Sequence, residues 1–337
     1  MKNATWKTIL VLLIMVIVFY VILKDDYQNI INTIQGANYF LIGLSLLLII
    51  IYYLLKSVCL YLIAKEQHKH ISLGKMIHQT LITQFFNGIT PFSTGGQPMQ
   101  IYMLTKSGIH IGKATSIIIQ DFLMYQLALV TVGIFVLISN QVFSFLNIGI
   151  AAYSLIMLGF IINTAIGLCL LFISFSRRFN NFIGKLLIKI LSKLRIVKDK
   201  EKTIREWESK LDEFHESGKI FKKNKLLFVK CYLFNVLALL VFYVIPYLIL
   251  ISFDAKCGIS ITAAITCSAF VLLIGNFVPI PGGSGGIEYS FYLIFGGIVK
   301  KSLLSPTVLV WRFFTYYLGV LVGGVALGFF KVKGSDK

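Results

Sequence analysis

Two short segments rich in glycine and proline carry the residues best suited to binding a ligand. The first reads TPFSTGGQP at residues 90–98, and the second reads PIPGGSGG at residues 279–286. Each precedes a predicted helix, where free amide groups and the positive end of the helix dipole favour a phosphate. Plain kinks in membrane helices have the same composition and are the alternative. The glycines of the second segment that we expect at a ligand are Gly283, Gly285 and Gly286.

Three ionisable residues, Asp121, Glu288 and Arg312, fall inside apolar stretches, where a charge is costly and marks a functional site. Glu288 opens the helix after the second segment and Arg312 lies in the last apolar stretch, so we expect the two to lie close together. They form either a structural salt bridge or a lipid site. In the lipid site, Arg312 binds a phosphate and Glu288 meets a cationic headgroup.

Neutral polar residues in the apolar stretches extend this candidate site. The sequence gives little support for catalysis or for metal or cofactor binding. Lys56 and Lys230 also lie in apolar stretches, and we expect both to snorkel to the cytoplasmic interface; a headgroup role is the alternative for the deeper Lys56. The sequence contains no phosphate-binding loop, dinucleotide fingerprint, metal-ligand pattern or C-x-x-C pair, so we predict no catalytic residue, cofactor, metal or disulfide. We interpret the five cysteines as small buried apolar residues. The polar set that we expect to shelter a headgroup is Gln84, Asn87, Gln97, Gln100, Asp121, Asn276, Glu288 and Arg312.

The elements that position these residues are membrane helices. Of the 337 residues, 57% are hydrophobic and only 14% are charged, and the mean hydropathy is +0.83, which excludes an ordinary soluble domain. A spanning helix needs about 20 apolar residues. The sequence therefore predicts an all-α polytopic membrane protein, one domain over residues 1–337, with six full spans. These spans are residues 8–23 (retained rather than cleaved), 39–63, 115–138, 148–175, 226–252 and 307–330.

Two further apolar stretches are interrupted near their middle by the two Gly/Pro segments. They cover residues 76–104 and 261–299. We predict that each folds as a re-entrant hairpin, in which a helix, a break and a returning helix enter and leave on one side. Two such segments in corresponding halves of a chain indicate an inverted-repeat transporter with its site at the midplane of the membrane.

The basic residues predict the topology. The chain has 32 Lys and Arg residues against 14 Asp and Glu, and cytoplasmic loops are enriched in Lys and Arg. With both termini in the cytoplasm of a multi-pass cell-membrane protein, 25 of the 32 lie on cytoplasmic segments. The first hairpin then opens from the cytoplasm and the second from outside.

Residues 177–225 form the largest predicted cytoplasmic loop. Within it, residues 181–196 place Lys185, Lys189 and Lys193 opposite an apolar face. This pattern is typical of a helix that lies on an anionic leaflet. A solvated loop that only enforces topology is the alternative. Because the apolar face and the membrane flanks favour lipid, we expect no nucleic-acid partner.

Three features together resemble a known family: TPFSTGGQPMQIY at residues 90–102, PIPGGSGGIE at residues 279–288, and Arg312. They are similar to the transmembrane, flippase-like region of the lysylphosphatidylglycerol synthetase family, and the resemblance covers nearly the whole chain. It implies lipid metabolism and antibiotic resistance, with movement of modified phospholipids or isoprenoid-linked lipids between leaflets. Two-part members carry a soluble aminoacyltransferase domain that we expect this chain to lack. Gln97 and Gln100 stand where many relatives carry an acidic residue and an arginine.

We therefore expect a flippase-like transporter that moves a polar or aminoacylated phospholipid, or another lipid-linked headgroup, through a polar cavity at the midplane. The alternatives are a secondary transporter of a small solute, the membrane part of a phosphatidylglycerol lysyltransferase system, and a scaffold that recruits a synthetase. We expect no enzyme activity of the chain on its own. Its expected partners are anionic or aminoacylated phospholipids, and a homodimer and a separate synthetase stay open.

Overall fold

Helices account for all regular secondary structure in the residues that the computed structural model describes, which are 27–144, 146, 149–193, 200–275 and 279–330. The all-α prediction is thus confirmed for this part of the chain. The first predicted span, residues 8–23, lies outside the described residues, as do Asn276 and both chain ends.

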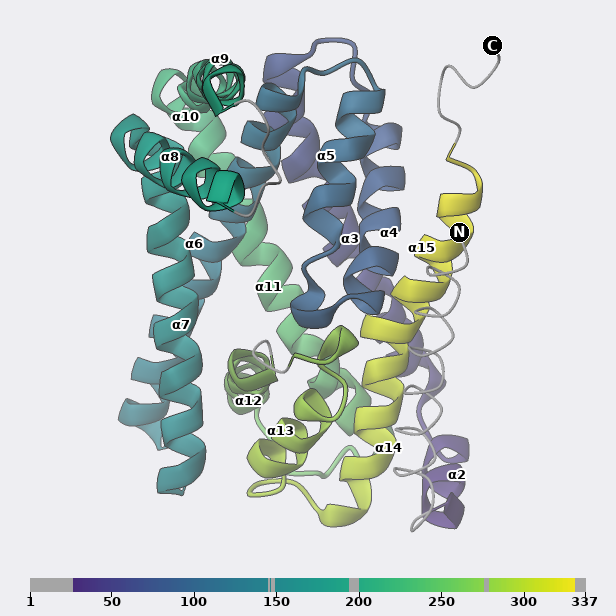
Figure 1. Ribbon diagram of the computed structural model, residues 1–337. Helices are drawn as coiled ribbons and strands as arrows, with labels where there is room; N and C mark the ends of the chain where they lie inside the picture. Colours follow the sequence, from purple (N-terminus) through teal and green to yellow (C-terminus); the bar gives the residue numbers. More distant parts are fainter. Residues whose placement is uncertain (1–26, 145, 147–148, 194–199, 276–278, 331–337) are drawn as a thin grey trace.

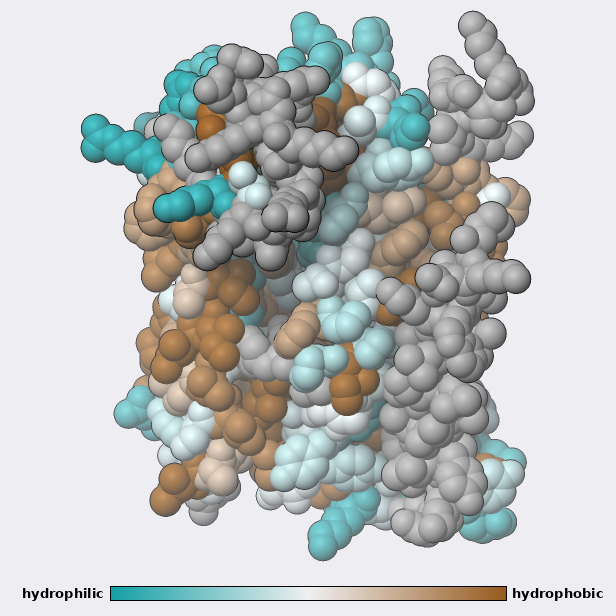
Figure 2. Space-filling model, in the orientation of Figure 1, coloured by the Kyte–Doolittle hydropathy of each residue, from teal (hydrophilic) through white to brown (hydrophobic). Residues whose placement is uncertain are grey.

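Five helices are long and apolar enough to cross a membrane, and they confirm five of the six predicted spans. The last one is continuous from Lys301 to Gly328 and contains a single π-helical stretch, Phe313–Tyr317. Large apolar side chains such as Phe135, Ile150 and Phe172 are exposed on these helices, and Figure 2 shows the resulting hydrophobic surface. This surface suits lipid acyl chains. The spans are α3 (Tyr39–Gln67), α6 (Ile111–Phe143), α7 (Ile150–Phe175), α11 (Lys225–Phe253) and α14 to α15 (Lys301–Arg312 and Leu318–Gly328).

The last helix begins at Lys301, six residues before the predicted start, although it contains Pro306. A proline inside a helix removes the N–H that would bond the carbonyl four residues earlier. That carbonyl belongs to Ser302, and it accepts a hydrogen bond of 3.0 Å from the Asn29 side chain. Asn29 lies on α2 (Tyr27–Gln35), a short helix that our sequence analysis did not predict. A neighbouring helix therefore supplies a donor to the carbonyl that Pro306 cannot bond.

Both Gly/Pro segments interrupt helical hairpins, as predicted. Figure 1 shows the two hairpins in opposite halves of the molecule, with their breaks in the middle. The two breaks contact each other. The first hairpin consists of α4 (Leu73–Ile89), η1 (Pro91–Ser93) and α5 (Gly96–Lys106), and the second of α12 (Ile261–Gly275), η2 (Pro281–Gly283) and α13 (Gly286–Phe295).

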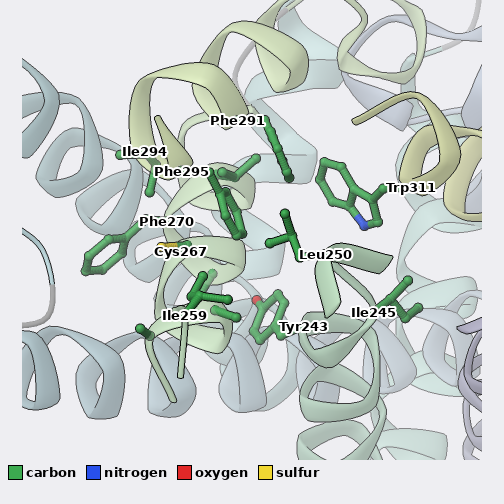
Figure 3. Packing of buried hydrophobic residues seen from close by; sticks show 14 of the residues in the cluster. Tyr243, Ile245, Leu250, Ile259, Cys267, Phe270, Phe291, Ile294, Phe295 and Trp311 are labelled. Carbon is green, nitrogen blue, oxygen red and sulfur yellow. The ribbon is translucent and has the colours of Figure 1, made fainter. Parts of the chain in front are cut away.

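The second hairpin is anchored in the largest hydrophobic core, which also includes α11 and α14. The rings of Phe291 and Phe295 stack with centroids 4.2 Å apart, and Trp311 lies 5.4 Å from Phe291 (Figure 3). Cys267 is buried in the same core. Burial also holds for three other cysteines, but Cys169 is exposed, so our prediction of buried cysteines is wrong at that position.

The basic loop folds as helices, and its position defines one end of the molecule. It contains α8 (Arg177–Lys193), α9 (Lys200–Gly218) and α10 (Ile220–Lys223), and α15 ends on the same side (Figure 1). At Gly184 a β-carbon would lie 2.2 Å from Trp207, so α8 and α9 pack closely there.

At the opposite end of the molecule, Lys300 donates a 2.9 Å hydrogen bond to Asp254 and holds the pKa of that carboxyl below its ordinary value.

The two ends of the molecule allow a direct test of the predicted orientation. In a variant without native cysteines, Lys256→Cys should react with a membrane-impermeant maleimide added outside intact cells, because Lys256 lies at the end we predict to be external. Glu208→Cys on α9 should react only after the membrane is permeabilised. Labelling of Glu208→Cys from outside, with Lys256→Cys protected, would show that the orientation is the reverse of the one we predict.

Candidate functional site

The second hairpin turns through three glycines that have a positive φ. The angles are 63° at Gly282, 63° at Gly283 and 83° at Gly285. Residues with a β-carbon rarely adopt this conformation. At Gly282 a β-carbon would also lie only 2.1 Å from the ring of Tyr316. The turn therefore requires glycine for its backbone conformation and for the close approach of the last helix.

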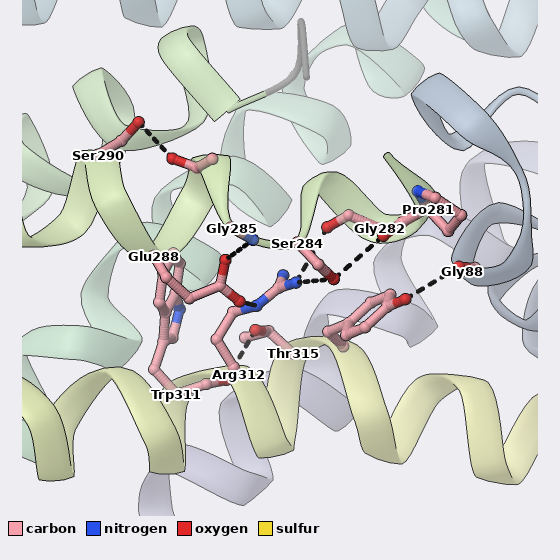
Figure 4. Close-up of polar contacts among 12 residues, drawn as sticks. Gly88, Pro281, Gly282, Ser284, Gly285, Glu288, Ser290, Trp311, Arg312 and Thr315 are labelled. Carbon is pink, nitrogen blue, oxygen red and sulfur yellow. Dashed lines mark hydrogen bonds and ion pairs between the residues drawn. The ribbon is translucent and has the colours of Figure 1, made fainter. Parts of the chain in front are cut away.

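Glu288 and Arg312 form a buried ion pair next to this turn (Figure 4). Arg312 Nε donates to Glu288 Oε1 over 2.7 Å, and each side chain is only 6% exposed. A second nitrogen of Arg312 donates to the Gly282 carbonyl at 3.0 Å and contacts Ser284 Oγ at 3.5 Å. The other carboxylate oxygen of Glu288 accepts a 2.7 Å hydrogen bond from the Gly285 amide. Arg312 thus bonds a carbonyl of the turn and Glu288 bonds an amide of the same turn, so the pair fixes the backbone of the turn at two points.

Tyr316 extends this cluster to the first hairpin. The guanidinium of Arg312 lies 4.3 Å from the centroid of the Tyr316 ring, in a cation–π contact. The Tyr316 hydroxyl donates a 2.9 Å hydrogen bond to the carbonyl of Gly88, near the end of α4 (Figure 4). Tyr316 belongs to the π-helical stretch of the last span. One tyrosine therefore connects the Arg312 cluster to the break of the first hairpin.

Side chains of the protein itself bond three backbone amides beside the helix starts that follow the breaks. In the first hairpin, the Gly95 amide donates to Thr90 Oγ1 over 2.8 Å, and the Gly96 amide donates to Asn87 Oδ1 over 3.0 Å. In the second hairpin, Glu288 caps the start of α13. We expected free amides at these helix starts to bind a phosphate, and the amides of Gly95, Gly96 and Gly285 are bonded to side chains instead.

A cavity of about 610 Å³ lies where the two hairpins meet, between α3, α6 and α7. Figure 2 shows this face hollowed between the surfaces of α7 and α5. Two apolar residues that line the cavity, Phe92 and Ile166, are also exposed. Polar side chains make up much of its wall. They are Lys56, Thr80, Thr83, Gln84, Asn87, Ser93, Thr94, Gln97, Gln100, Asp121, Gln126 and Asn163.

The predicted site residues divide between this main cavity and the ion-pair cluster. Arg312 lines a smaller adjoining cavity of about 170 Å³, together with Gln84 and Asn87. Gly285 and Glu288 belong to the cluster around the ion pair, and Gly286 begins α13 beside them. The predicted residues that line the main cavity are Gln84, Asn87, Gln97, Gln100, Asp121 and Gly283.

Lys56 is a cavity residue that our sequence analysis placed elsewhere. It lies near the middle of α3, and its ammonium donates a 2.9 Å hydrogen bond to Asn235 Oδ1 of α11. The same nitrogen lies 4.6 Å from the centroid of the Tyr125 ring. The prediction that Lys56 snorkels to the interface is therefore wrong. The depth of Lys56 in its apolar stretch was the sequence feature that could have placed it in the cavity. A lysine near the centre of a spanning helix cannot easily reach either surface of the membrane.

Two side chains of α6 complete the polar wall. Gln126 donates to the Asn163 carbonyl at 2.6 Å, which ties α6 to α7. Asp121 is only 8% exposed, and its Oδ1 has no hydrogen-bond partner in the described part of the chain. A buried polar atom without a partner is costly, and a ligand or water molecule that donates to Oδ1 would remove this cost. Among the described residues, no group of three His, Cys, Asp or Glu residues could hold a metal ion.

Breaking the buried pair should destabilise the protein far more than breaking an exposed pair. Removing one partner of a buried pair costs about 3–5 kcal/mol because the other charge is left uncompensated. Glu288→Gln and Arg312→Gln should each lower the melting temperature in detergent strongly. The double variant should recover only part of the loss, because Arg312 also holds Gly282 and Tyr316. Asp254→Asn, at the exposed pair with Lys300, is the control and should change little. Equal melting temperatures for Arg312→Gln and Asp254→Asn would contradict the role of the buried ion pair in holding the second turn.

Comparisons with known proteins agree with this architecture. A UPF0104 membrane protein of Archaeoglobus fulgidus is 24% identical over 309 residues, which cover 90% of this chain and 90% of the relative. An uncharacterized protein of Mycoplasma pneumoniae, described as an MG306 homolog, is 24% identical over 331 residues, or 93% of this chain and 84% of the relative. The family pattern described as "Lysylphosphatidylglycerol synthase TM region" matches residues 8–323. The chain therefore belongs to the family of lysylphosphatidylglycerol synthase transmembrane regions.

Proposed function

We propose that this membrane protein carries the polar headgroup of a phospholipid or another lipid-linked group between the leaflets, while the acyl chains stay in the bilayer. The observation that carries the proposal is the main cavity, about 610 Å³ in volume and lined by charged, amide and hydroxyl side chains. A headgroup that crosses about 30 Å of hydrocarbon needs such a polar shelter.

The arrangement of the hairpins supports a transport function. Their breaks contact each other beside the cavity, and the hairpins extend from there toward opposite ends of the molecule (Figure 1). If both are re-entrant, each blocks the path from one side of the membrane. Opposed broken helices that meet at a binding site are a recurrent basis of alternating access in transporters.

Exposed apolar residues in the cavity wall favour a lipid over a water-soluble solute. Phe92 and Ile166 line the cavity and are exposed, at 54% and 38%. We propose that these residues border an apolar opening toward the acyl chains, through which a lipid enters with its headgroup inside and its chains outside. A separate synthetase that supplies a modified lipid, and a second copy of this chain, are the further partners we propose.

The proposal can be tested by filling the cavity. Gln97 lines it from α5 and is half-buried, so Gln97→Trp should slow lipid movement several-fold without preventing folding. Thr105→Trp on the exposed face of the same helix is the matched control and should behave as the parent. The measurement is the dithionite-accessible fraction of a fluorescent phospholipid in reconstituted vesicles. If the parent protein moves none of a panel of anionic, zwitterionic and aminoacylated lipids, the proposal fails.

A further inference from the structure

The main cavity contains one positive and one negative side chain that are held apart. Lys56 and Asp121 both line it, and no ion pair within 4.0 Å joins Lys56 to a carboxylate among the described residues. Lys56 is held by neutral groups instead, the Asn235 amide oxygen and the Tyr125 ring. Within the described part of the chain, the cavity therefore presents a cation that has no carboxylate within 4.0 Å, near the centre of a spanning helix.

Arg312, the residue that sequence analysis placed at a phosphate, is already committed. Its guanidinium bonds Glu288 and the Gly282 carbonyl and lies on Tyr316. A phosphate that recruited Arg312 would have to break the contacts that hold the second turn. Lys56 has no such conflict, because a primary ammonium has three donors and Asn235 accepts one hydrogen bond from it.

We propose that Lys56 binds the anionic phosphate of the headgroup and that Asp121 accepts a hydrogen bond from an O–H or N–H donor on the same headgroup. This assignment rests on the proposed function and adds the substrate class to it. The unpartnered Oδ1 of Asp121, on a side chain that is more than nine-tenths buried, supplies the acceptor. The cavity then selects lipids that carry a phosphate diester together with a donor, and it discriminates against neutral lipids and against phosphate diesters without a donor.

Three short-chain lipids separate the two halves of this proposal. Dioctanoyl phosphatidylglycerol carries both a phosphate and hydroxyl donors, dioctanoyl phosphatidylmethanol carries the phosphate alone, and dioctanoylglycerol carries no phosphate. Binding to the purified full-length chain in detergent can be followed by the change in its intrinsic fluorescence during titration. The parent should bind the three in that order of decreasing affinity. Replacing phosphatidylglycerol by phosphatidylethanolamine then tests whether the donor can equally be an ammonium.

Lys56→Met should weaken binding of phosphatidylglycerol by roughly tenfold or more, the usual effect of losing a charge-assisted hydrogen bond. It should leave binding of dioctanoylglycerol unchanged. Lys56→Arg keeps the charge and should retain most of the affinity. Lys230→Met, at an exposed lysine of α11, is the matched control and should bind as the parent.

Asp121→Leu should remove the preference for phosphatidylglycerol over phosphatidylmethanol while binding of phosphatidylmethanol persists. It should also leave the melting temperature equal or higher, because it replaces a buried unpartnered polar atom by an apolar group. Unchanged phosphatidylglycerol affinity in Lys56→Met, with lipid movement intact, would overturn this assignment and leave the proposed function standing. Lys56-dependent binding by a protein that moves no lipid in vesicles would retain the binding site and refute the transport function.

Discussion

Two helical hairpins are broken inside the helix bundle of a membrane protein, and there the polar groups of their backbones must be satisfied without bulk water. The second break depends on Arg312 and Glu288, which bond the carbonyl of Gly282 and the amide of Gly285. The first break is capped by its own α4 and joined to the cluster through Tyr316 and Gly88. Because both turns are fixed in this way, their contact can form one side of a polar cavity.

This division of roles changes how the charged residues are understood. Charge at membrane depth marks function, but Arg312 and Glu288 already bond each other and the backbone of the second turn. The cavity itself presents Lys56 and Asp121, whose charges are not paired with each other. Such a site is costly when empty and gains most from a ligand that supplies the missing partners. A lipid headgroup with a phosphate and a donor would do so, while its acyl chains pass the exposed Phe92 and Ile166.

The sequence predicted much of the fold because hydrophobic length and Gly/Pro breaks are local properties. It located five spans, both hairpins, and the proximity of Glu288 and Arg312. It did not predict α2, and the hydrogen bond from Asn29 of α2 to the Ser302 carbonyl joins segments far apart in the sequence. It placed Lys56 at the interface, since the route of a long side chain depends on neighbours such as Asn235 and Tyr125. It expected free amides at the helix starts, because caps such as Asn87 on Gly96 come from residues that the turn brings together.

The central claim is that the main cavity holds the headgroup of a lipid whose chains stay in the bilayer. A cryo-electron microscopy structure of the protein in a nanodisc that contains phosphatidylglycerol tests this claim most directly. We predict headgroup density inside the cavity between Lys56 and Asp121, continuous with acyl-chain density that leaves past Phe92 and Ile166. A well-resolved cavity that contains only water, with every ordered lipid confined to the outer surface of the helices, would contradict the account.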